Sequence, residues 1–279
     1  MTTSRQYHFI SNIHGFSVSY IEGHSTLEEL NKIHNIGPFA FSFYQKTLMS
    51  SLQMLSFIKA TENIGFYIDS EDPYYRFKVE ISPSGTYRTL LLPEDFDDFP
   101  KTLTGKCRLS KMTAGKTPYT SILEFNNHAL EEIVNEVIDK SYQTNAKIQL
   151  SKDENSSLMV LKLPPSNINK KIEDFNDLNL EAIHKKYQGL FDEALKLKKT
   201  NVEEVEKIFA AHGLKYLGSK EVKFHCPCSK QRMADNLLTL PLKDQVELFE
   251  KMPVIEVRCD YCNSIYDVYE NDVLKPKIH

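Results

Sequence analysis

Alternation of apolar and polar residues predicts a series of half-buried strands in the N-terminal part of the chain, up to Pro165. Two turn sequences, Asp72-Pro73 and Pro83-Ser-Gly85, separate three of these strands. Short strands joined by tight turns favour antiparallel pairing, so we expect a largely antiparallel sheet. The predicted strands span residues 15–21, 64–68, 75–81, 87–92, 121–125, 147–150 and 158–163.

Helical periodicity interrupts this strand pattern twice. Residues 38–60 are predicted to form a long buried helix. A second helix begins at Leu130, where apolar residues recur at the spacing of one helix face as Leu130, Ile133, Val134, Val137 and Ile138. Together these elements predict an α+β protein whose N-terminal α/β domain covers residues 1–165.

Residues 166–218 show little strand pattern and carry two thin apolar stripes. The first stripe is Leu180, Ile183, Tyr187, Leu190 and Phe191; the second is Val202, Val205, Ile208 and Phe209. Helices with such narrow apolar faces depend on docking to their neighbours for stability. We therefore predict a metastable helical linker over residues 166–218.

The last segment, residues 219–279, combines two predicted helices, 232–238 and 242–252, with a predicted hairpin. Its strands, 254–259 and 264–268, flank the sequence Cys259-Asp-Tyr-Cys262. A second cysteine pair, Cys226-Pro-Cys228, lies near the start of the segment, and both predicted helices lie between the two pairs. We predict that residues 219–279 form a small cysteine-bearing domain.

Composition narrows the choice of protein class. The 279 residues are 41% hydrophobic and 26% charged, which is typical of a globular protein, and the net charge is −4, which excludes a basic surface over the whole chain. The most apolar stretch, residues 39–58, contains too many polar side chains for a membrane span, among them Ser42, Gln45, Lys46, Ser50, Ser51, Gln53 and Ser56. With no secretory signal at the N-terminus, we expect a cytoplasmic location, no membrane contact and reduced cysteines.

Two close cysteine pairs on tight turns are the ligand set of a tetrahedral Zn²⁺ site. We predict that Cys226, Cys228, Cys259 and Cys262 bind one structural zinc ion as a closed four-thiolate shell. The Cys-x-Cys pair is one residue shorter than the usual spacing of zinc ribbons. Two permanent disulfides, which a reducing compartment disfavours, and an iron–sulfur cluster are the alternatives for these thiols.

Oxidation of these thiolates would destroy the ligands and release the metal. A domain as small as the segment 219–279 is near the lower limit of independent stability. Structural zinc contributes about 10–16 kcal/mol to such domains, whereas whole domains are stable by only about 5–15 kcal/mol. Loss of zinc is therefore expected to unfold the C-terminal domain.

The cysteine segment resembles a known family. The sequences Cys226-Pro-Cys228-Ser-Lys-Gln-Arg232 and Val254-Ile-Glu-Val-Arg-Cys259-Asp-Tyr-Cys262 are similar to those of the redox-regulated heat-shock holdase of about thirty-three kilodaltons in bacteria. The resemblance is strong over residues 205–270. Upstream of residue 205 it is weaker, but the matching segments occur in the same order. Asp69-Ser-Glu-Asp-Pro73 stands where the family has a glycine-rich turn, so the N-terminal domain is divergent.

This resemblance implies an ATP-independent chaperone rather than an enzyme. The reduced, zinc-loaded form would be an inactive monomer. Under oxidative stress, disulfides Cys226–Cys228 and Cys259–Cys262 would form, zinc would leave, and the C-terminal domain and the linker would unfold. The exposed apolar surface would then bind unfolding client proteins, and the active form would be a homodimer.

Two other functions are compatible with the cysteines. A zinc-ribbon domain that binds nucleic acid is disfavoured because the cysteine segment holds nine basic and ten acidic residues. A thiol–disulfide oxidoreductase usually carries Cys-x-x-Cys at the start of a helix, whereas here the motif is predicted to lie between two strands. We therefore expect no nucleic-acid partner and no catalytic residue.

Overall fold

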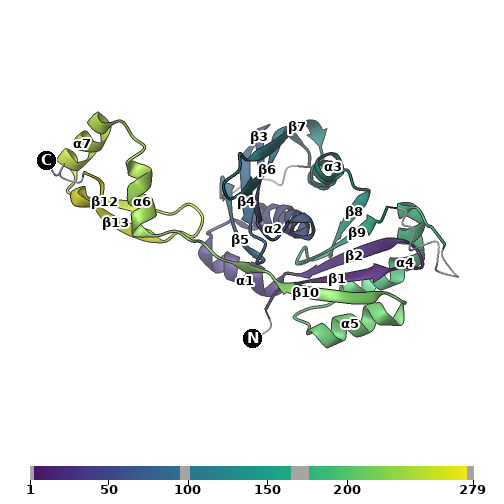
Figure 1. Cartoon of the computed structure of the whole chain (residues 1–279). Coiled ribbons are helices and arrows are strands. Elements are labelled where there is room, and N and C mark those ends of the chain that lie inside the picture. Colours follow the sequence, from purple (N-terminus) through teal and green to yellow (C-terminus); the bar gives the residue numbers. More distant parts are fainter. Residues whose placement is uncertain (1–2, 95–100, 165–175, 275–279) are drawn as a thin grey trace. The chain divides into compact units, whose positions relative to one another are not determined.

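The computed structural model describes residues 3–94, 101–164 and 176–274, apart from the side chain of Glu131. The chain divides into two compact units, of which the larger ends at Phe224 and the smaller begins at His225 (Figure 1). The predicted α+β class is confirmed, with antiparallel sheets in both units. Each unit is described separately below.

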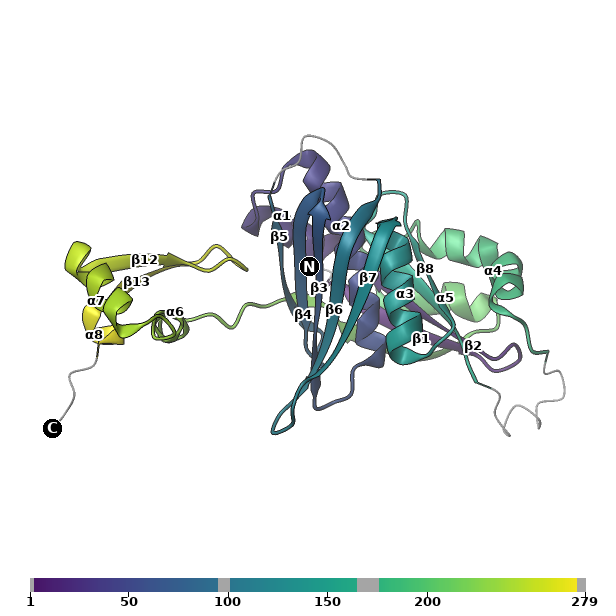
Figure 2. The ribbon, with the colours of Figure 1, turned by 90° about the horizontal axis from the view of Figure 1, so that it is seen from above.

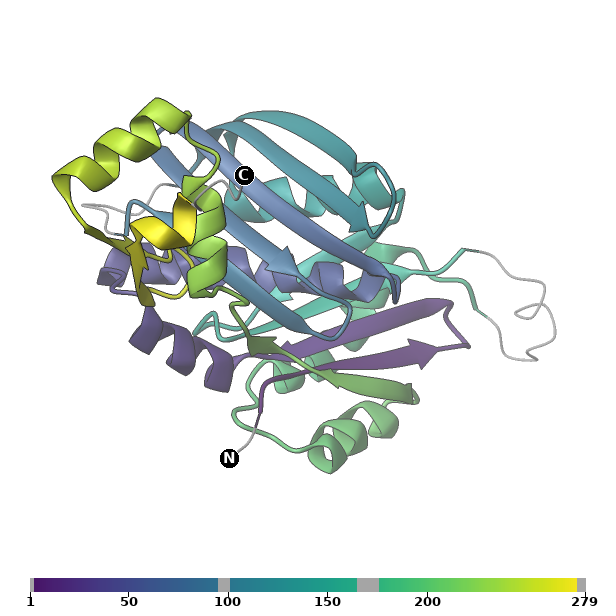
Figure 3. The ribbon, with the colours of Figure 1, turned by 60° about the vertical axis from the view of Figure 1, so that its left-hand side comes forward.

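The larger unit contains a five-stranded sheet with the order β10–β1–β2–β9–β8. All four pairings are antiparallel. Figure 3 shows β10, in green, beside β1, in purple. Neither β1 nor β10 was predicted from the pattern. The strands are β1 (Arg5–Ser11), β2 (Phe16–Glu22), β8 (Ala146–Leu150), β9 (Ser156–Lys162) and β10 (Lys215–Glu221).

A six-stranded sheet with the order β11–β5–β4–β3–β6–β7 forms the other half of this unit (Figure 2). Its pairings are antiparallel except for the short parallel pair of β11 and β5. Strand β6 is an addition to the predicted set. The strands are β3 (Glu62–Asp72), β4 (Tyr74–Ile81), β5 (Thr86–Leu92), β6 (Leu103–Thr113), β7 (Tyr119–His128) and β11 (Lys223–Phe224).

The main hydrophobic core joins the six-stranded sheet to helices and to one face of the five-stranded sheet. The helices are α1 (His24–Ile33), α2 (Pro38–Leu52), the 3₁₀ helix η1 (Gln53–Phe57) and α3 (Leu130–Tyr142). The predicted helix over 38–60 is thus shorter than expected, because the α-helical hydrogen bonding ends at Leu52 and a tighter 3₁₀ turn follows. Helix α3 buries the apolar face that the sequence predicts.

The opposite face of the five-stranded sheet is covered by α4 (Leu180–Ala194) and α5 (Val202–Ala211) (Figure 1). Both helices start at an asparagine, Asn179 or Asn201, whose side chain accepts a hydrogen bond from a first-turn backbone N–H. Both apolar stripes predicted for residues 166–218 pack in this second core. Residues 165–175, which include the predicted start of the linker, lie outside the described residues.

After α5 the chain returns to the five-stranded sheet as β10. The expected boundary at residue 218 falls inside this strand, and the described linker residues belong to the larger compact unit. No side chain of β10 is fully buried, so backbone pairing with β1 is its main attachment. The chain then pairs β11 with β5 and continues to the first cysteine.

The smaller unit contains a two-stranded antiparallel sheet and three helices among its described residues. Its core consists of Met233, Ala234, Phe249, Ile255, Val268 and Val273. Among the described residues, neither unit contains a helix long and apolar enough to cross a membrane. The elements are α6 (Lys230–Leu237), α7 (Leu242–Lys251), β12 (Val254–Arg258), β13 (Ile265–Tyr269) and α8 (Glu270–Val273).

Candidate metal centre

The first cysteine turn lies between β11 and α6. Cys226 and Cys228 flank Pro227, whose ring fixes φ and keeps the turn short. Ser229 follows at once and caps α6, because its hydroxyl accepts a hydrogen bond from the backbone N–H of Arg232 at 3.3 Å. The start of a helix thus holds one side of the turn in place.

The second cysteine turn joins β12 to β13. The backbone N–H of Cys259 donates to the carbonyl of Ser264 at 2.9 Å, and that of Asn263 donates to the carbonyl of Cys259 at 2.8 Å. Asn263 adopts a φ of 58°, a left-handed conformation that asparagine tolerates well. Its side-chain oxygen accepts two hydrogen bonds from Arg258, at 2.9 and 2.7 Å. The hairpin geometry therefore fixes Cys259 and Cys262.

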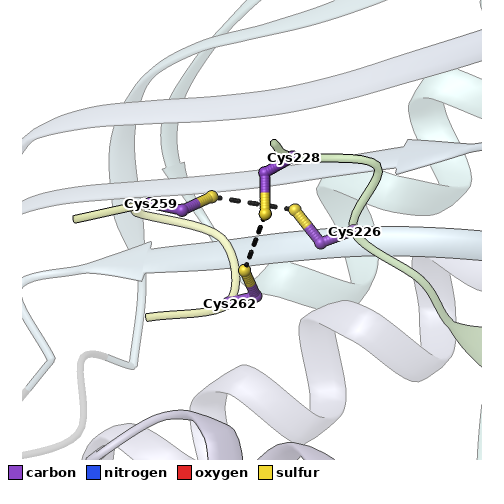
Figure 4. A group of neighbouring side chains, drawn as sticks. All are labelled: Cys226, Cys228, Cys259 and Cys262. Atoms are coloured by element: carbon purple, nitrogen blue, oxygen red, sulfur yellow. Dashed lines mark hydrogen bonds between the residues drawn. The ribbon is translucent and has the colours of Figure 1, made fainter. Parts of the chain in front are cut away.

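The four sulfur atoms converge on one point (Figure 4). All lie within 4.8 Å of one another, with 3.7 Å between Cys226 and Cys259 and 3.2 Å between Cys228 and Cys262. A tetrahedron of Zn–S bonds of about 2.3 Å has edges of roughly 3.8 Å, so the cluster is of the right size for such an ion. All four cysteines are free thiols in this structure, and the group could hold a metal ion.

The thiols differ in their surroundings. Burial raises the pKa of Cys226 and of Cys259 above the usual value. Burial also opposes ionisation of Cys262, but hydrogen bonds with Ser264 and the neighbouring sulfurs outweigh it and lower its pKa to about 7. A bound metal cation would favour the thiolate form of all four groups, because ligand sulfurs must be deprotonated.

Two hydroxyl groups lie next to the cluster, although no motif in the sequence indicates them. The Tyr266 hydroxyl lies 3.1 Å from the sulfur of Cys228, and the Ser264 hydroxyl lies 3.2 Å from that of Cys262. Their positions shortly after Cys262 in the sequence place both next to the second turn. The hairpin itself was predicted, but its strand pattern does not show that the Tyr266 hydroxyl reaches the sulfur of Cys228 on the other turn.

The cations close to the cysteines in sequence make their described contacts elsewhere. Lys230 forms an ion pair with Asp272 at 2.7 Å, and Arg232 donates to the carbonyl of Pro227 at 2.9 Å. Arg258 donates to Asn263. Apart from the neighbouring sulfurs, the described side-chain groups at hydrogen-bonding distance from the thiols are therefore two neutral hydroxyls, of which Ser264 accepts a hydrogen bond from the free Cys262 thiol.

Separate from the cysteine cluster, the larger unit contains an extended apolar interface between α4, α5 and the five-stranded sheet. Phe9 of β1 stacks on Phe209 of α5, with ring centroids 4.0 Å apart and an interplanar angle of 9°. The ring of Phe16 on β2 packs against that of Tyr187 on α4, with the two centroids 5.0 Å apart. The sheet face contributes large, fully buried apolar and aromatic side chains, which helices α4 and α5 cover.

Charged groups connect the loop between α4 and α5 to the end of β2, to α1 and to the turn between β8 and β9. The buried carboxylate of Glu22 accepts hydrogen bonds from the His24 ring at 2.6 Å and from the backbone N–H of Lys199 at 3.4 Å. Lys198 pairs with Asp153 at 3.2 Å, and Lys199 pairs with Glu28 at 2.7 Å. The hydrogen bond with Glu22 raises the pKa of His24 above 6.5.

The fifth cysteine, Cys107, is separate from the cluster. It lies on β6 and is 1% exposed in the main core. Burial raises the pKa of its thiol to about 12, which outweighs any effect of the flanking Lys106 and Arg108. An inert buried thiol is therefore the interpretation that the structure supports.

Comparisons with known proteins agree with the fold and the cysteine cluster. Residues 4–269 match the model of the Hsp33 protein family. A 33 kDa chaperonin of Aquifex aeolicus is 20% identical over an alignment covering 93% of this chain and 85% of that protein. A 33 kDa chaperonin of Agathobacter rectalis is 38% identical over 63 residues, which cover 23% of this chain and 22% of that protein.

A solved structure is also similar. The crystal structure of the 33 kDa chaperonin of Thermotoga maritima aligns with a TM-score of 0.71 at 17% sequence identity. The alignment covers 99% of this chain and 97% of that one, so the two proteins share a fold. Together with the family match over nearly the whole chain, this shows that the protein belongs to the Hsp33 family.

Proposed function

We propose that this protein is a redox-regulated, ATP-independent holdase chaperone, inactive when reduced and zinc-bound. The observation that carries the proposal is the convergence of four sulfurs from two turns that are separated in the chain by helices α6 and α7 and strand β12. Chaperone function is further supported by the Hsp33 family match and by relatives named 33 kDa chaperonin.

Zinc is the metal that fits this donor set best. Four thiolates form a soft donor set that fills the four positions of a tetrahedral ion, which is typical of a structural Zn²⁺ site. Cys226, Cys228, Cys259 and Cys262 would hold the ion, and zinc would supply the cross-link between the two turns. Because the core of the smaller unit holds six buried apolar residues among those described, this cross-link would contribute much of its stability.

Oxidation would open the site through disulfides within each turn, Cys226–Cys228 and Cys259–Cys262. For each disulfide, two thiolates transfer two electrons to one hydrogen peroxide, which takes up two protons and leaves as two water molecules. Two such steps consume all four ligands and release Zn²⁺ without changing its oxidation state. The loops closed by these disulfides are too short to replace the metal as a cross-link.

Unfolding of the cysteine-bearing region would then reach the helical linker. Only short connections, residues 212–214 and Val222, separate α5 from β10 and β10 from β11, which leads to the first cysteine. Helices α4 and α5 are short and depend on the sheet for stability. Their release would expose the aromatic sheet face together with their own apolar stripes, and this surface would bind unfolding client proteins.

The remaining parts of the proposal follow from the family resemblance. The reduced protein would be a monomer and the active form a homodimer in the cytoplasm. The protein would hold client chains stoichiometrically and without catalytic turnover. The domain scheme of a core domain (1–165), a metastable linker (166–218) and a redox-switch domain (219–279) is part of this proposal.

Parallel measurements of zinc release and chaperone activity test the proposal. The reduced protein is treated with hydrogen peroxide at mild heat, or with hypochlorite, while a colorimetric chelator reports free zinc and light scattering follows a heated test protein. We expect about one zinc per chain to be released as aggregation is suppressed. Cys226→Ser should lose zinc and be active without oxidant, whereas Cys107→Ser should behave as wild type. Zinc release without suppression of aggregation would contradict the proposal.

A further inference from the structure

Resting on the proposed function, we propose that Tyr266 is a positioning residue that protects the metal-binding thiolates from premature oxidation. Its hydroxyl lies 3.1 Å from the sulfur of Cys228, at the distance of a hydrogen bond to sulfur. A metal-bound thiolate has no proton to donate, so in the zinc-loaded state the tyrosine must be the donor. The hydrogen bond would draw electron density from the sulfur that an oxidant attacks.

The position of the tyrosine ring is fixed by the fold rather than by the sulfur. Tyr266 lies on β13 opposite Val257 of β12, and its ring packs against the core of the smaller unit. Cys228 packs against the same core from the first turn. The hydroxyl and the sulfur are therefore brought together by two separate elements, and their contact also joins the two cysteine turns.

A hydrogen-bond donor would stabilise this site because the zinc-loaded cluster carries excess negative charge. Four thiolates and one Zn²⁺ carry a net charge of −2, and Lys230 and Arg232 are engaged with Asp272 and the Pro227 carbonyl. Lys230 also lies over the ring of Tyr269, at 4.6 Å from its centroid. Apart from the contacts between the sulfurs themselves, the hydroxyls of Tyr266 and Ser264 are the described side-chain groups at hydrogen-bonding distance from the cluster, one for each cysteine turn. Ser264 accepts from the free Cys262 thiol, and both hydroxyls would donate once the sulfurs are deprotonated by a metal.

The chemical consequence concerns the first oxidation step. A ligand sulfur attacks hydrogen peroxide, forms an S–O bond and breaks the O–O bond, giving a sulfenic acid and hydroxide. The neighbouring thiolate then displaces a second hydroxide to form the disulfide. Nucleophilicity follows basicity with a slope of about 0.4–0.5, so a hydrogen bond that lowers sulfur basicity about tenfold slows the attack roughly threefold.

The test compares Tyr266→Phe with Tyr269→Phe, a matched substitution on the same strand that leaves the sulfur contact intact. Both variants and the wild type are loaded with Zn²⁺ and treated with hydrogen peroxide, and zinc release is followed with a chelator. We expect Tyr266→Phe to release zinc roughly threefold faster and to bind zinc about 10- to 100-fold more weakly in chelator competition. Tyr269→Phe should match the wild type.

A spectroscopic measurement separates this role from a general loss of packing. With Co²⁺ in place of zinc, the thiolate-to-metal charge-transfer absorption should move to longer wavelength in Tyr266→Phe, because a sulfur without its hydrogen bond is easier to oxidise. Unchanged absorption together with unchanged release rate and affinity would overturn the proposal.

If the wild type itself holds no zinc, or keeps it after oxidation, the proposed function fails instead. Ser264→Ala, which removes the other hydroxyl, provides a second test should Tyr266→Phe fold poorly, with the same shift expected.

Discussion

Replacing Phe209 with alanine removes the side chain that connects α5 most closely to the five-stranded sheet. The ring is fully buried and stacks on Phe9 with centroids 4.0 Å apart. It also lies 6.3 Å from the ring of Tyr20, at an interplanar angle of 39°. The substitution therefore leaves a cavity at the centre of the interface between helix and sheet.

The expected cost is large compared with the stability of these helices. A buried Phe→Ala substitution destabilises a protein by about 3–5 kcal/mol. Helices of 15 and 10 residues have little stability of their own, so this cost falls on their docking to the sheet. Since about 1.4 kcal/mol is a factor of ten, the population with α4 and α5 detached should rise by a factor of about 10² to a few times 10³.

Hydrogen exchange of the reduced, zinc-loaded protein measures this opening directly. We expect faster exchange over residues 180–211, with one zinc retained and some suppression of client aggregation without oxidant. Glu206→Ala, an exposed substitution on the same helix, is the matched control and should exchange as the wild type does. Wild-type exchange in Phe209→Ala would refute the idea that the docking of α5 depends on this contact.

Three further predictions concern the metal, a buried ion pair and a tight turn. Chelation of zinc at neutral pH and without oxidant should unfold residues 225–274 while leaving the larger unit intact, as NMR signal dispersion would reveal; a module that stays folded without metal contradicts the zinc argument. Because Glu22 raises the pKa of His24 above 6.5, the stabilisation by this pair is fully present below about pH 6.5 and is lost as pH rises through the folded pKa. The difference in thermal midpoint between wild type and His24→Gln should therefore shrink from about pH 6 to about pH 9, and a constant difference would speak against the pair. Gly85→Ala should destabilise the larger unit by well over about 1 kcal/mol in a denaturant titration, since its φ is +89° and a Cβ would lie 2.0 Å from the carbonyl oxygen of Glu221. Gly115→Ala, also at positive φ but in open space, should cost much less, and equal costs would exclude the close approach as the cause.

Sequence patterns identified the elements whose side chains separate cleanly into apolar and polar faces. Helix α3 is the clearest case, because its apolar residues from Leu130 to Ile138 follow one face and are buried as expected. The cysteine cluster was also predictable, because two short pairs of one residue type leave few chemical alternatives. The hairpin β12–β13 followed from the strand pattern on either side of its cysteine turn.

Two of the missed elements have weaker patterns for physical reasons. Strand β10 is an edge strand with no fully buried side chain, so its attachment to β1 is made by backbone groups that the sequence does not display. In β1 both faces are covered, and Gln6 is buried through a hydrogen bond with Ser19 at 2.8 Å. Strand β6, by contrast, does show the alternation of a half-buried strand, with Lys106 and Arg108 exposed and Cys107 and Leu109 buried, so its omission has no physical reason and the prediction was incomplete there.

Each sulfur lies close to a sulfur of the other turn, so the choice of disulfide partner decides whether oxidation stabilises or opens the smaller unit. Cys226 faces Cys259 and Cys228 faces Cys262, across separations of 33 and 34 residues. A bond across the turns would restrict a loop of that size and stabilise the fold by about 4 kcal/mol, whereas a bond within one turn contributes roughly 2 kcal/mol or less. Disulfides between the two turns would therefore keep the smaller unit folded, whereas disulfides within each turn would let it unfold. Both outcomes consume the same four thiols and the same oxidant.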